Sequence, residues 1–518
     1  MALDTPTPPT APEDLAATAG RAPAAPAAPA APAAAELPAA PAAAPAAAAA
    51  AAAATAAAAA RRTGRPGRSA LVLFVLCAAQ FMVALDFSVL NVALPALGAD
   101  LGMSRSALQW AVTAFALPSG GFLLLFGRTG DLFGRRKLFL AGLALFGAAS
   151  LLATFAWDPA SFLAGRALQG VGAAAIVPTG MSLLTTTFPE GPQRDRALGI
   201  SGTLMSLGFT VGMVSGGVLT DALGWRSTMG LLALFTLIVL PLAPGILTES
   251  RNPERPRLDV PGAVTVTGGL FALIYALSTA AERGFGGWDV LVTLVAGLAL
   301  LTAFVLVEAR AKAPLVSLAM LRRPSVAWGN LGGLATFATM TTVVFVLTLY
   351  LQEVLHLSAS QTGLIFGVQG VMSVIAGALT PRVVGRLGAR RTLVVSLLLQ
   401  GLLMAALVSV GARSGALLVT VLVSLASMAH LGAIVSYGLT VTSGVPDAEQ
   451  GLATGLVTTT QQVSLTVGIP LLGVLATTQD DLFTGVRLVL ALAGGLAVLT
   501  ALLAAYGLRG RALRGGRA

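Results

Sequence analysis

The sequence predicts an all-α polytopic membrane protein with fourteen transmembrane helices. Of its 518 residues, 56% are hydrophobic and only 10% are charged, and the mean hydropathy is +0.85. A soluble protein carries about 25% charged residues. An α-helix needs about 20 apolar residues to cross a bilayer, and such stretches recur through most of the chain. We therefore expect a lipid bilayer to surround most of the protein.

The predicted spans follow one another closely from residue 70 to residue 507. The loops between them are too short to fold alone, so no soluble domain is predicted, and the even number of spans places both ends of the chain on one side. The expected limits are 70–92, 107–127, 138–157, 160–183, 197–220, 227–247, 261–281, 289–308, 326–350, 360–382, 392–411, 415–438, 452–477 and 484–507.

The cationic residues set the expected orientation. Of the 32 Lys and Arg residues, Arg166 lies inside a span and most of the others share one side of the membrane. Those on the opposite side are Arg105, Arg226, Arg283, Arg413 and Arg487. Because cytoplasmic loops hold the excess of Lys and Arg, both termini are predicted to be cytoplasmic. Nucleic-acid binding needs one basic face, whereas these arginines are scattered over many segments, so no nucleic-acid partner is expected.

Composition marks the two ends of the chain. Residues 1–68 are rich in Ala and Pro and end in a basic cluster, which predicts a disordered cytoplasmic tail with a basic anchor. Residues 509–518 form a basic cytoplasmic tail. The preference for Arg over Lys and the alanine-rich tail indicate a GC-rich bacterium, and hence a bacterial plasma membrane. The lone cysteine, Cys77, excludes an internal disulfide and a cysteine-rich metal site.

A short basic motif occurs twice and indicates two related halves. Residues 130–136 contain a Gly, four further residues and two Arg, and residues 385–391 repeat this spacing. Both copies occupy the same loop if 69–250 and 311–508 are six-helix halves and 251–310 is a pair of inserted helices. Parallel repeats of this kind are typical of rocking transporters. Chance recurrence stays an alternative, since every predicted cytoplasmic loop is rich in arginine.

Asp86 is a lone acid in the middle of the first predicted span. A charged acid at the centre of a bilayer helix costs about 2.5–3.5 kcal/mol on insertion scales, so it normally faces a cavity and has a function. A desolvated carboxyl holds a proton more readily, which favours a role in proton coupling. The alternative is a structural acid that is paired permanently with an arginine or capped by a hydroxyl such as that of Ser88.

Arg166 is the predicted partner of Asp86, because it is the one basic residue inside a span. A guanidinium keeps its charge, so it would modulate the acid rather than carry protons. Gln169 follows at i+3 and lies on the same helix face. The alternative for Arg166 is snorkelling from a span that begins near Ser161.

Four motifs carry a resemblance to a known family. The motif between the second and third predicted spans, which begins at Gly127, resembles the signature loop of the major facilitator superfamily, and we call it the loop motif. The other three motifs are similar to motifs of the fourteen-helix drug–proton antiporter branch of that superfamily. The similarity covers residues 70 to about 508. The motifs are Gly127-x3-Asp131-x2-Gly134-Arg135-Arg136-Lys137, the run from Leu85 through Asp86 and Asn91 to Pro95, Arg166-x2-Gln169-Gly170-x-Gly172, and Gly199-x8-Gly208-x3-Gly212-Met213-x2-Gly216-Gly217.

The resemblance implies a major facilitator fold and a monomeric exporter of small amphipathic drugs or antibiotics. Protons would drive it through Asp86, and no cofactor would be needed. In the loop motif, Asp131 would accept hydrogen bonds from a helix N-terminus of the other half, since an anion suits that end. The alternative is a loop that serves only to set topology. The glycines of the fifth span would permit close packing and flexing.

One departure from the family pattern concerns Met213, which stands where the family has a proline, and it weakens the argument for export. Two rival functions therefore stay open. One is a permease of the same fold for a sugar, an amino acid or a siderophore. The other is a non-transporting membrane sensor, which would have no need of an acid and an arginine in the middle of the membrane.

A further set of polar residues within the spans could line a substrate path. The competing interpretations are hydrogen bonds within one helix and, for the histidine, simple packing. The candidates are Asn91, Asn330, Gln369, His430, Gln461 and Gln462.

Overall fold

A computed structural model describes residues 68–508, except for 190, 251–258, 285, 312–317, 412–414, 447–449, 478 and 480. The predicted terminal tails, up to residue 67 and from residue 509, lie outside the described residues. In the described ranges all regular elements are helices, as predicted.

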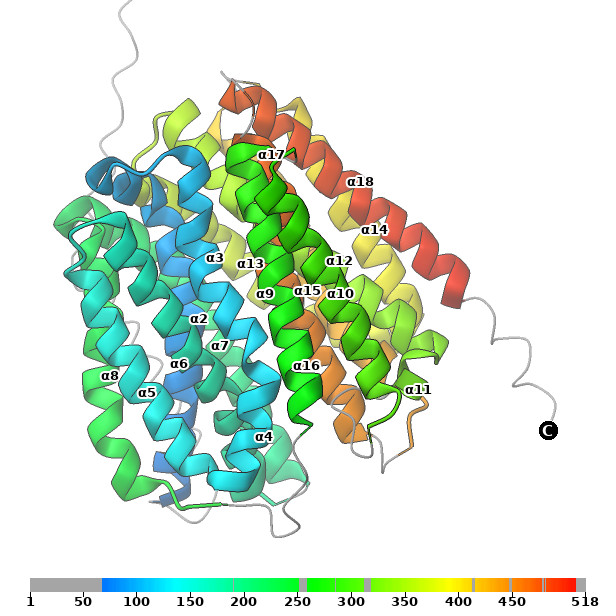
Figure 1. Cartoon of the computed structure of the whole chain (residues 1–518). Helices are drawn as coiled ribbons and strands as arrows, with labels where there is room; N and C mark the ends of the chain where they lie inside the picture. The colour runs from blue at the N-terminus through cyan, green and yellow to red at the C-terminus, as the bar shows by residue number, and fades with distance from the viewer. Residues whose placement is uncertain are drawn as a thin grey trace, which may run out of the picture. The chain divides into compact units, whose positions relative to one another are not determined.

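The first half consists of one long helix followed by five further helical rods (Figure 1). The first of these five consists of two helices, α3 and α4, which are bent by 49° relative to each other close to Pro118 and Gly121. Proline is a common cause of such a sharp kink. The elements are α2 (Arg68–Leu101), α3 (Arg105–Gly121), α4 (Leu123–Phe133), α5 (Arg135–Thr154), α6 (Pro159–Thr187), α7 (Pro192–Leu223) and α8 (Arg226–Ile246).

The second half repeats this order after a short helix. Between α16 and α17 the chain forms a π-helical segment at Ile469–Gly473. Pro470 in this segment lacks the N–H that a regular helix needs. The elements are α11 (Leu318–Leu321), α12 (Pro324–Leu349) with a π-helical end at Tyr350–Val354, α13 (Ala359–Leu387), α14 (Ala389–Ala406), α15 (Ala416–Thr442), α16 (Gln450–Gly468), α17 (Val474–Thr477) and α18 (Leu482–Leu508).

Packing within the two halves follows one scheme. Helix α2 packs against α6, α7 and α8, and α12 packs against α15, α16 and α18 in the same way. The pair α5 and α6 corresponds to α14 and α15, and α3 with α6 corresponds to α13 with α15. The main contacts between the halves are those of α7 with α13 and of α3 with α16. Each helix of the first half therefore has a counterpart in the second.

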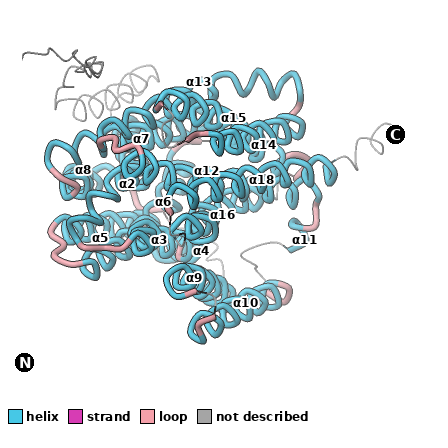
Figure 2. The backbone as a smooth tube through the Cα atoms, turned by 90° about the horizontal axis from the view of Figure 1, so that it is seen from above, coloured by secondary structure: helices cyan, strands magenta, loops and turns pink. Residues whose placement is uncertain are grey.

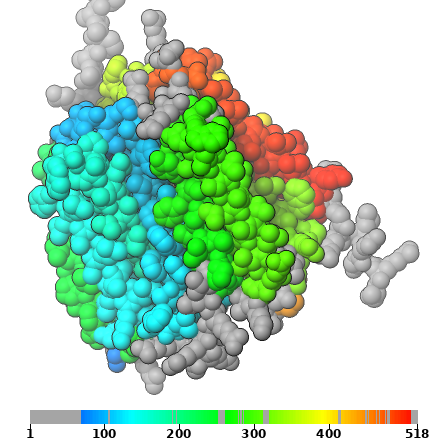
Figure 3. Space-filling model, viewed as in Figure 1, coloured from blue at the N-terminus to red at the C-terminus, as the bar shows by residue number. Residues whose placement is uncertain are grey.

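The inserted pair lies beside both halves. Helices α9 (Val260–Arg283) and α10 (Trp288–Glu308) pack on each other. Figure 2 shows the pair at one edge of the helix bundle. Helix α9 contacts α3 of the first half and the π-helical segment Ile469–Gly473 of the second. In the space-filling view this green pair covers the surface between the two halves (Figure 3). Most side chains of α10 are exposed, as expected of a helix that faces lipid.

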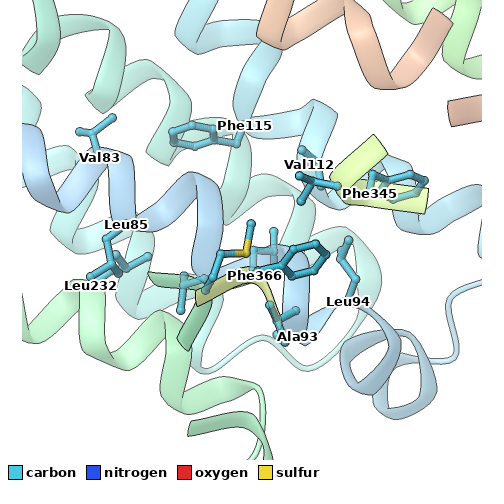
Figure 4. Close-up of a cluster of buried hydrophobic side chains, with 14 of the residues drawn as sticks. Val83, Leu85, Ala93, Leu94, Val112, Phe115, Leu232, Phe345 and Phe366 are labelled. Atoms are coloured by element: carbon cyan, nitrogen blue, oxygen red, sulfur yellow. The ribbon is translucent and has the colours of Figure 1, made fainter. Parts of the chain in front are cut away.

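The apolar core is continuous from one half to the other. Leu94 and Val112 of the first half lie beside Phe345 and Phe366 of the second in Figure 4, and all four belong to one cluster of buried side chains. The contact between the halves is therefore a packed apolar core at this level of the molecule.

Eleven helices of the described chain are long and apolar enough to cross a membrane, or twelve if α3 and α4 count as one bent span. Helices α9 and α16 stand at the predicted seventh and thirteenth spans, and α9 contains a shorter apolar stretch at Pro261–Leu277. The helical content and the multiple spans are confirmed. The count of fourteen and the domain limits stay predictions.

Candidate proton-coupling and gating sites

An ion pair lies buried at the centre of the first half. Asp86 of α2 is 0% exposed and Arg166 of α6 is 1% exposed. Arg166 Nη1 donates to Asp86 Oδ1 over 2.6 Å. The sequence predicted this pairing, and the packing of α6 against α2 produces it. Two full charges removed from water require close pairing, because an unpaired buried charge costs several kcal/mol.

Arg166 is held by three further groups. Its Nε donates to the carbonyl of Ala111 over 3.1 Å, and its Nη1 donates to Gln169 Oε1 over 2.8 Å. Its guanidinium carbon also lies 4.5 Å from the centre of the Phe115 ring, a distance at which a cation is attracted to the ring. These contacts fix the guanidinium beside the acid.

A hydroxyl on a third helix completes this site. Gln169 Nε2 donates to Ser150 Oγ of α5 over 2.8 Å, and that hydroxyl donates to the Phe146 carbonyl. We call Asp86, Arg166, Gln169 and Ser150 the N-half cluster. The structure brings together the three residues that the sequence predicted, whereas Ser150 was missed because nothing distinguishes it from other serines in apolar helices.

Part of the N-half cluster is left without a partner. Asp86 Oδ2 is buried and accepts no hydrogen bond from the described residues. Ser88, the predicted alternative cap, donates instead to the carbonyls of Ala84 and Leu85 in its own helix. Because Arg166 occupies Oδ1, the free Oδ2 is the carboxylate atom that can take a proton without displacing the guanidinium.

The basic loop motif is anchored within its own half. Gly134 has a φ of +118°, and a Cβ there would lie 2.8 Å from the Glu249 carboxylate, so only glycine suits this position. Glu249 Oε1 accepts from the backbone N–H of Arg136 over 3.1 Å. Arg135 donates to Asp131 over 2.9 Å and to the Ser250 hydroxyl over 3.2 Å. The residues after α8 therefore hold the loop in place.

The predicted contact of Asp131 with the other half is not made in this conformation. Asp131 lies near the end of α4, and its partner is Arg135 at the start of α5. No hydrogen bond to a described helix N-terminus of the second half is formed. Gly127 packs only loosely, since a Cβ there would lie 3.6 Å from Pro178.

The glycines of α7 make two kinds of contact. A Cβ on Gly208, Gly212 or Gly216 would lie within 2.7 Å of atoms of α2, so these three residues let α7 approach the helix that carries Asp86. A Cβ on Gly217 would lie 2.3 Å from the carbonyl of Ala359 in the second half. Gly199 has nothing within 4 Å and serves no contact in this conformation.

The halves meet along the predicted outer part of α7 and α13. Asp221 accepts from the backbone N–H groups of Ala359 and Ser360 over 3.2 and 2.8 Å. A Cβ on Gly363 would lie 2.6 Å from the carbonyl of Met213. Near the same end, Gln352 Nε2 donates to the Val92 carbonyl over 2.8 Å. We call these contacts the outer seam.

The predicted inner parts of α7 and α13 do not touch at their glycines. Gly199 and Gly202 of α7 and Gly385 of α13 have open space where a Cβ would stand. Contact along the outer part and separation along the inner part describe a conformation closed at the predicted outer end. The acid that joins the two halves here is therefore Asp221, which the sequence did not single out.

The predicted path residues do not form a single site. Asn91 donates to the carbonyl of Phe87, and Asn330 accepts from Thr460 over 2.7 Å. Gln461 is partly exposed on α16, and the side chain of Gln462 lies outside the described residues.

Gln369 and His430 lie on neighbouring helices of the second half, α13 and α15. Gln369 Oε1 has no partner among the described residues. His430 Nδ1 lies 2.9 Å from Thr336 Oγ1, and this hydroxyl lies 2.5 Å from Gln400 Oε1. We call Thr336, Gln400 and His430 the C-half cluster, of which the sequence predicted only the histidine.

Comparison with known proteins gives a consistent result. The family described as Major Facilitator Superfamily matches residues 76–469. The chain is 39% identical to the cephamycin export protein CmcT of Amycolatopsis lactamdurans, over 76% of this chain and 82% of that protein. It is 37% identical to the puromycin resistance protein pur8 of Streptomyces alboniger, over 83% and 90%.

Solved structures agree on the fold alone. The peptide transporter PepTSo is 15% identical, with a TM-score of 0.66 over 86% of this chain and 98% of that one. The human organic anion transporter MFSD10 is 17% identical, with a TM-score of 0.60 over 85% and 100%. From the family match, the two antibiotic-related relatives and the paired halves, the chain belongs to the major facilitator superfamily.

Proposed function

We propose that this protein is a proton-coupled exporter of small amphipathic compounds such as antibiotics. The observation that carries the proposal is the buried ion pair of Asp86 and Arg166 beside the glycine-lined face of α7. The relatives named for cephamycin export and puromycin resistance support the direction of transport and the class of substrate. A bacterial plasma membrane, cytoplasmic termini and a monomer belong to the same proposal.

The chemistry of coupling rests on competition for one carboxylate. A proton on Asp86 Oδ2 neutralises the acid and removes most of its attraction for Arg166. The guanidinium keeps its charge and then depends on Gln169 and the Ala111 carbonyl for hydrogen bonds. Loading and unloading this proton therefore changes the packing of α6 against α2, the two helices that meet at the site.

The outer seam provides the element that must open. Asp221 and the N-terminus of α13 hold the closed state by charge and backbone hydrogen bonds. In the opposite state the seam separates and the inner loops approach, where Asp131 would take the role that Asp221 has here. The membrane potential favours inward movement of the coupled proton by about 2.3 kcal/mol per charge per 100 mV.

The test is accumulation of a fluorescent cation in a bacterial host without its own pumps. We expect cells that express the protein to hold less dye than cells with empty vector, and to lose this difference when a protonophore collapses the gradient. Asp86→Asn keeps the size of the side chain but cannot titrate, so it should accumulate dye like the empty vector. Equal export by Asp86→Asn and the wild type would remove Asp86 from the coupling.

A further inference from the structure

We propose that His430 and Gln369 form a hydrogen-bond acceptor site in the second half that binds N–H or O–H donors of the transported compound. The proposal deepens the function proposed above and rests on it. It starts from two side chains on the contacting helices α13 and α15: Gln369 Oε1 is buried without a partner among the described residues, and His430 uses its Nδ1 toward Thr336.

The hydrogen bonds of the C-half cluster fix the tautomer of His430. Gln400 Nε2 donates to the Thr336 backbone carbonyl over 3.2 Å. A carbonyl can only accept, so the amide nitrogen points that way and Gln400 Oε1 points to the Thr336 hydroxyl. The hydroxyl has one hydrogen and uses it on Oε1 over 2.5 Å. His430 Nδ1, at 2.9 Å from the same oxygen, must then be the donor.

A neutral imidazole with its proton on Nδ1 leaves a lone pair on Nε2. The His430 ring is partly exposed, and no described residue donates to Nε2. No acid lies near enough to hold a charged ring, because the described parts of α12, α13, α14, α15 and α16 carry no Asp or Glu. Their charged residues are arginines at the inner ends of α13 and α14. His430 is therefore an acceptor.

Gln369 supplies the second acceptor. It is 4% exposed, and Ser373, one turn along α13, donates to its backbone carbonyl over 3.1 Å. The Ser373 hydroxyl also lies 3.2 Å from that of Ser427 on α15. Ser427 and His430 are three residues apart and share a helix face. These contacts place both residues beside the line where α13 and α15 meet, with Gln369 one turn before the serine contact and His430 about one turn after it.

An unpaired buried acceptor costs about 1–3 kcal/mol, so a ligand that offers a donor there is favoured over one that does not. The buried Gln369 Oε1 and the Nε2 of the partly exposed His430 ring, without a nearby cation, match a compound that carries N–H or O–H groups. They give no advantage to a compound whose nitrogens are fully alkylated. The second half thus selects the polar groups of the substrate, while the first half holds the proton.

The first experiment reads the tautomer directly. The chain has only two histidines, and His356 stands in a loop with a φ of 54°, a conformation that Asn tolerates. Full-length His356→Asn protein in lipid nanodiscs, labelled with ¹⁵N-histidine, then gives the signals of His430 alone. We expect a protonated Nδ1 and an unprotonated Nε2. A protonated Nε2 in the neutral ring would overturn the proposal.

The second experiment uses two dyes of equal charge. Rhodamine 123 carries N–H donors, and tetramethylrhodamine methyl ester is the same scaffold with every N–H replaced by N-methyl. We expect rhodamine 123 to shift the Nε2 signal of His430 and the methylated dye to leave it unchanged. Equal responses to the two dyes, or no response to rhodamine 123, would overturn the acceptor site.

Export by cells separates this proposal from the function itself. We expect the export ratio of rhodamine 123 to the methylated dye to fall about 2- to 10-fold in His430→Asn. That variant keeps a donor toward Thr336 but has no atom at the Nε2 position. His430→Gln restores an acceptor there and should restore the ratio. An unchanged ratio in His430→Asn overturns the site while export stands. Export of neither dye, with the spectral shift preserved, supports the site and contradicts export of these dyes.

Discussion

The two halves place polar clusters on corresponding helices but give them opposite electrical character. The N-half cluster joins α2, α5 and α6 through Asp86, Ser150 and Arg166. The C-half cluster joins α12, α14 and α15 through Thr336, Gln400 and His430. The first contains two full charges, whereas the second consists of an amide, a hydroxyl and an imidazole.

This difference indicates that the two similar halves have different functions. A charged pair in a membrane interior responds to a proton, because neutralising one partner removes the attraction between them. A neutral network responds little to a proton but offers fixed donors and acceptors. We therefore propose that the first half carries proton coupling and the second recognises substrate donors, and the predictions below test the physical difference between the two clusters.

The largest expected effect on the free energy of unfolding comes from a substitution in the charged N-half cluster. Arg166→Met leaves the Asp86 carboxylate buried without its partner, and we expect a loss of about 3–5 kcal/mol in the free energy of unfolding. The measurement is denaturant unfolding of purified protein in bicelles. Arg226→Met is the control, because Arg226 and its partner Asp100 are 42% and 47% exposed, and a loss of about 0–1 kcal/mol is expected there. Equal losses in the two variants would show that burial does not distinguish the pairs.

A substitution in the neutral C-half cluster should lower the free energy of unfolding by a smaller amount. Thr336→Val conserves the shape of the side chain but leaves His430 Nδ1 and Gln400 Oε1 unpaired, so we expect a loss of about 1–3 kcal/mol. Thr348→Val is the matched control, since this buried hydroxyl donates only to the Val344 carbonyl of its own helix. The same unfolding measurement applies. A Thr336→Val protein as stable as the Thr348→Val protein would contradict the network.

A smaller effect is expected at the outer seam, where the first half again supplies the charge and the second supplies backbone N–H groups. Asp221→Asn removes the anion from the N-terminus of α13, which we expect to cost about 1 kcal/mol and to raise the outward-open population about fivefold. Spin labels at Leu223→Cys and Ser358→Cys, in a Cys77→Ser background, report the separation by pulsed electron paramagnetic resonance.

The control for the seam is Asp131→Asn, because in this conformation Asp131 pairs with Arg135 of its own half and with no described residue of the other half. We expect the distance distribution at the outer end to change less in that variant. A larger opening with Asp131→Asn than with Asp221→Asn would reverse the roles assigned to the two acids.

The smallest expected effect on stability concerns the N-terminal caps of two corresponding helices, α6 and α15. Asp158 caps α6, while the N-cap residue of α15 is Gly415, which has no side chain to cap the helix. Hydrogen bonds from the Ser161 hydroxyl and backbone N–H hold the pKa of Asp158 below its ordinary value. This stabilisation is present above the unfolded pKa of about 3.9 and is lost as the pH falls through the lower folded pKa.

Asp158→Ser keeps a capping oxygen but does not titrate. We therefore expect the wild type and Asp158→Ser to have similar thermal stability at pH 7, and the wild type to lose more stability between pH 5 and pH 3. Parallel pH profiles of the two proteins would exclude a contribution from the cap.

Sequence alone determined the helical architecture and the identity of the charged pair. Long uncharged stretches leave few alternatives to membrane helices, and a lone acid and a lone arginine within such stretches have few possible partners. Asp86, Arg166 and Gln169 were therefore predicted correctly to lie together. The resemblance of four motifs also identified the family.

Only the tertiary structure decided which neutral groups complete each site and where the halves touch. Ser150, Thr336 and Gln400 are common residue types in apolar helices, so no local pattern marks them. Asp221 meets Ser360 across 139 residues of sequence, and Glu249 meets the loop motif across 113. Such contacts depend on the rotation of each helix about its axis and on which end of the bundle is closed. Those quantities follow from packing between helices, because the side-chain periodicity of an almost uniformly apolar helix does not distinguish one face from another.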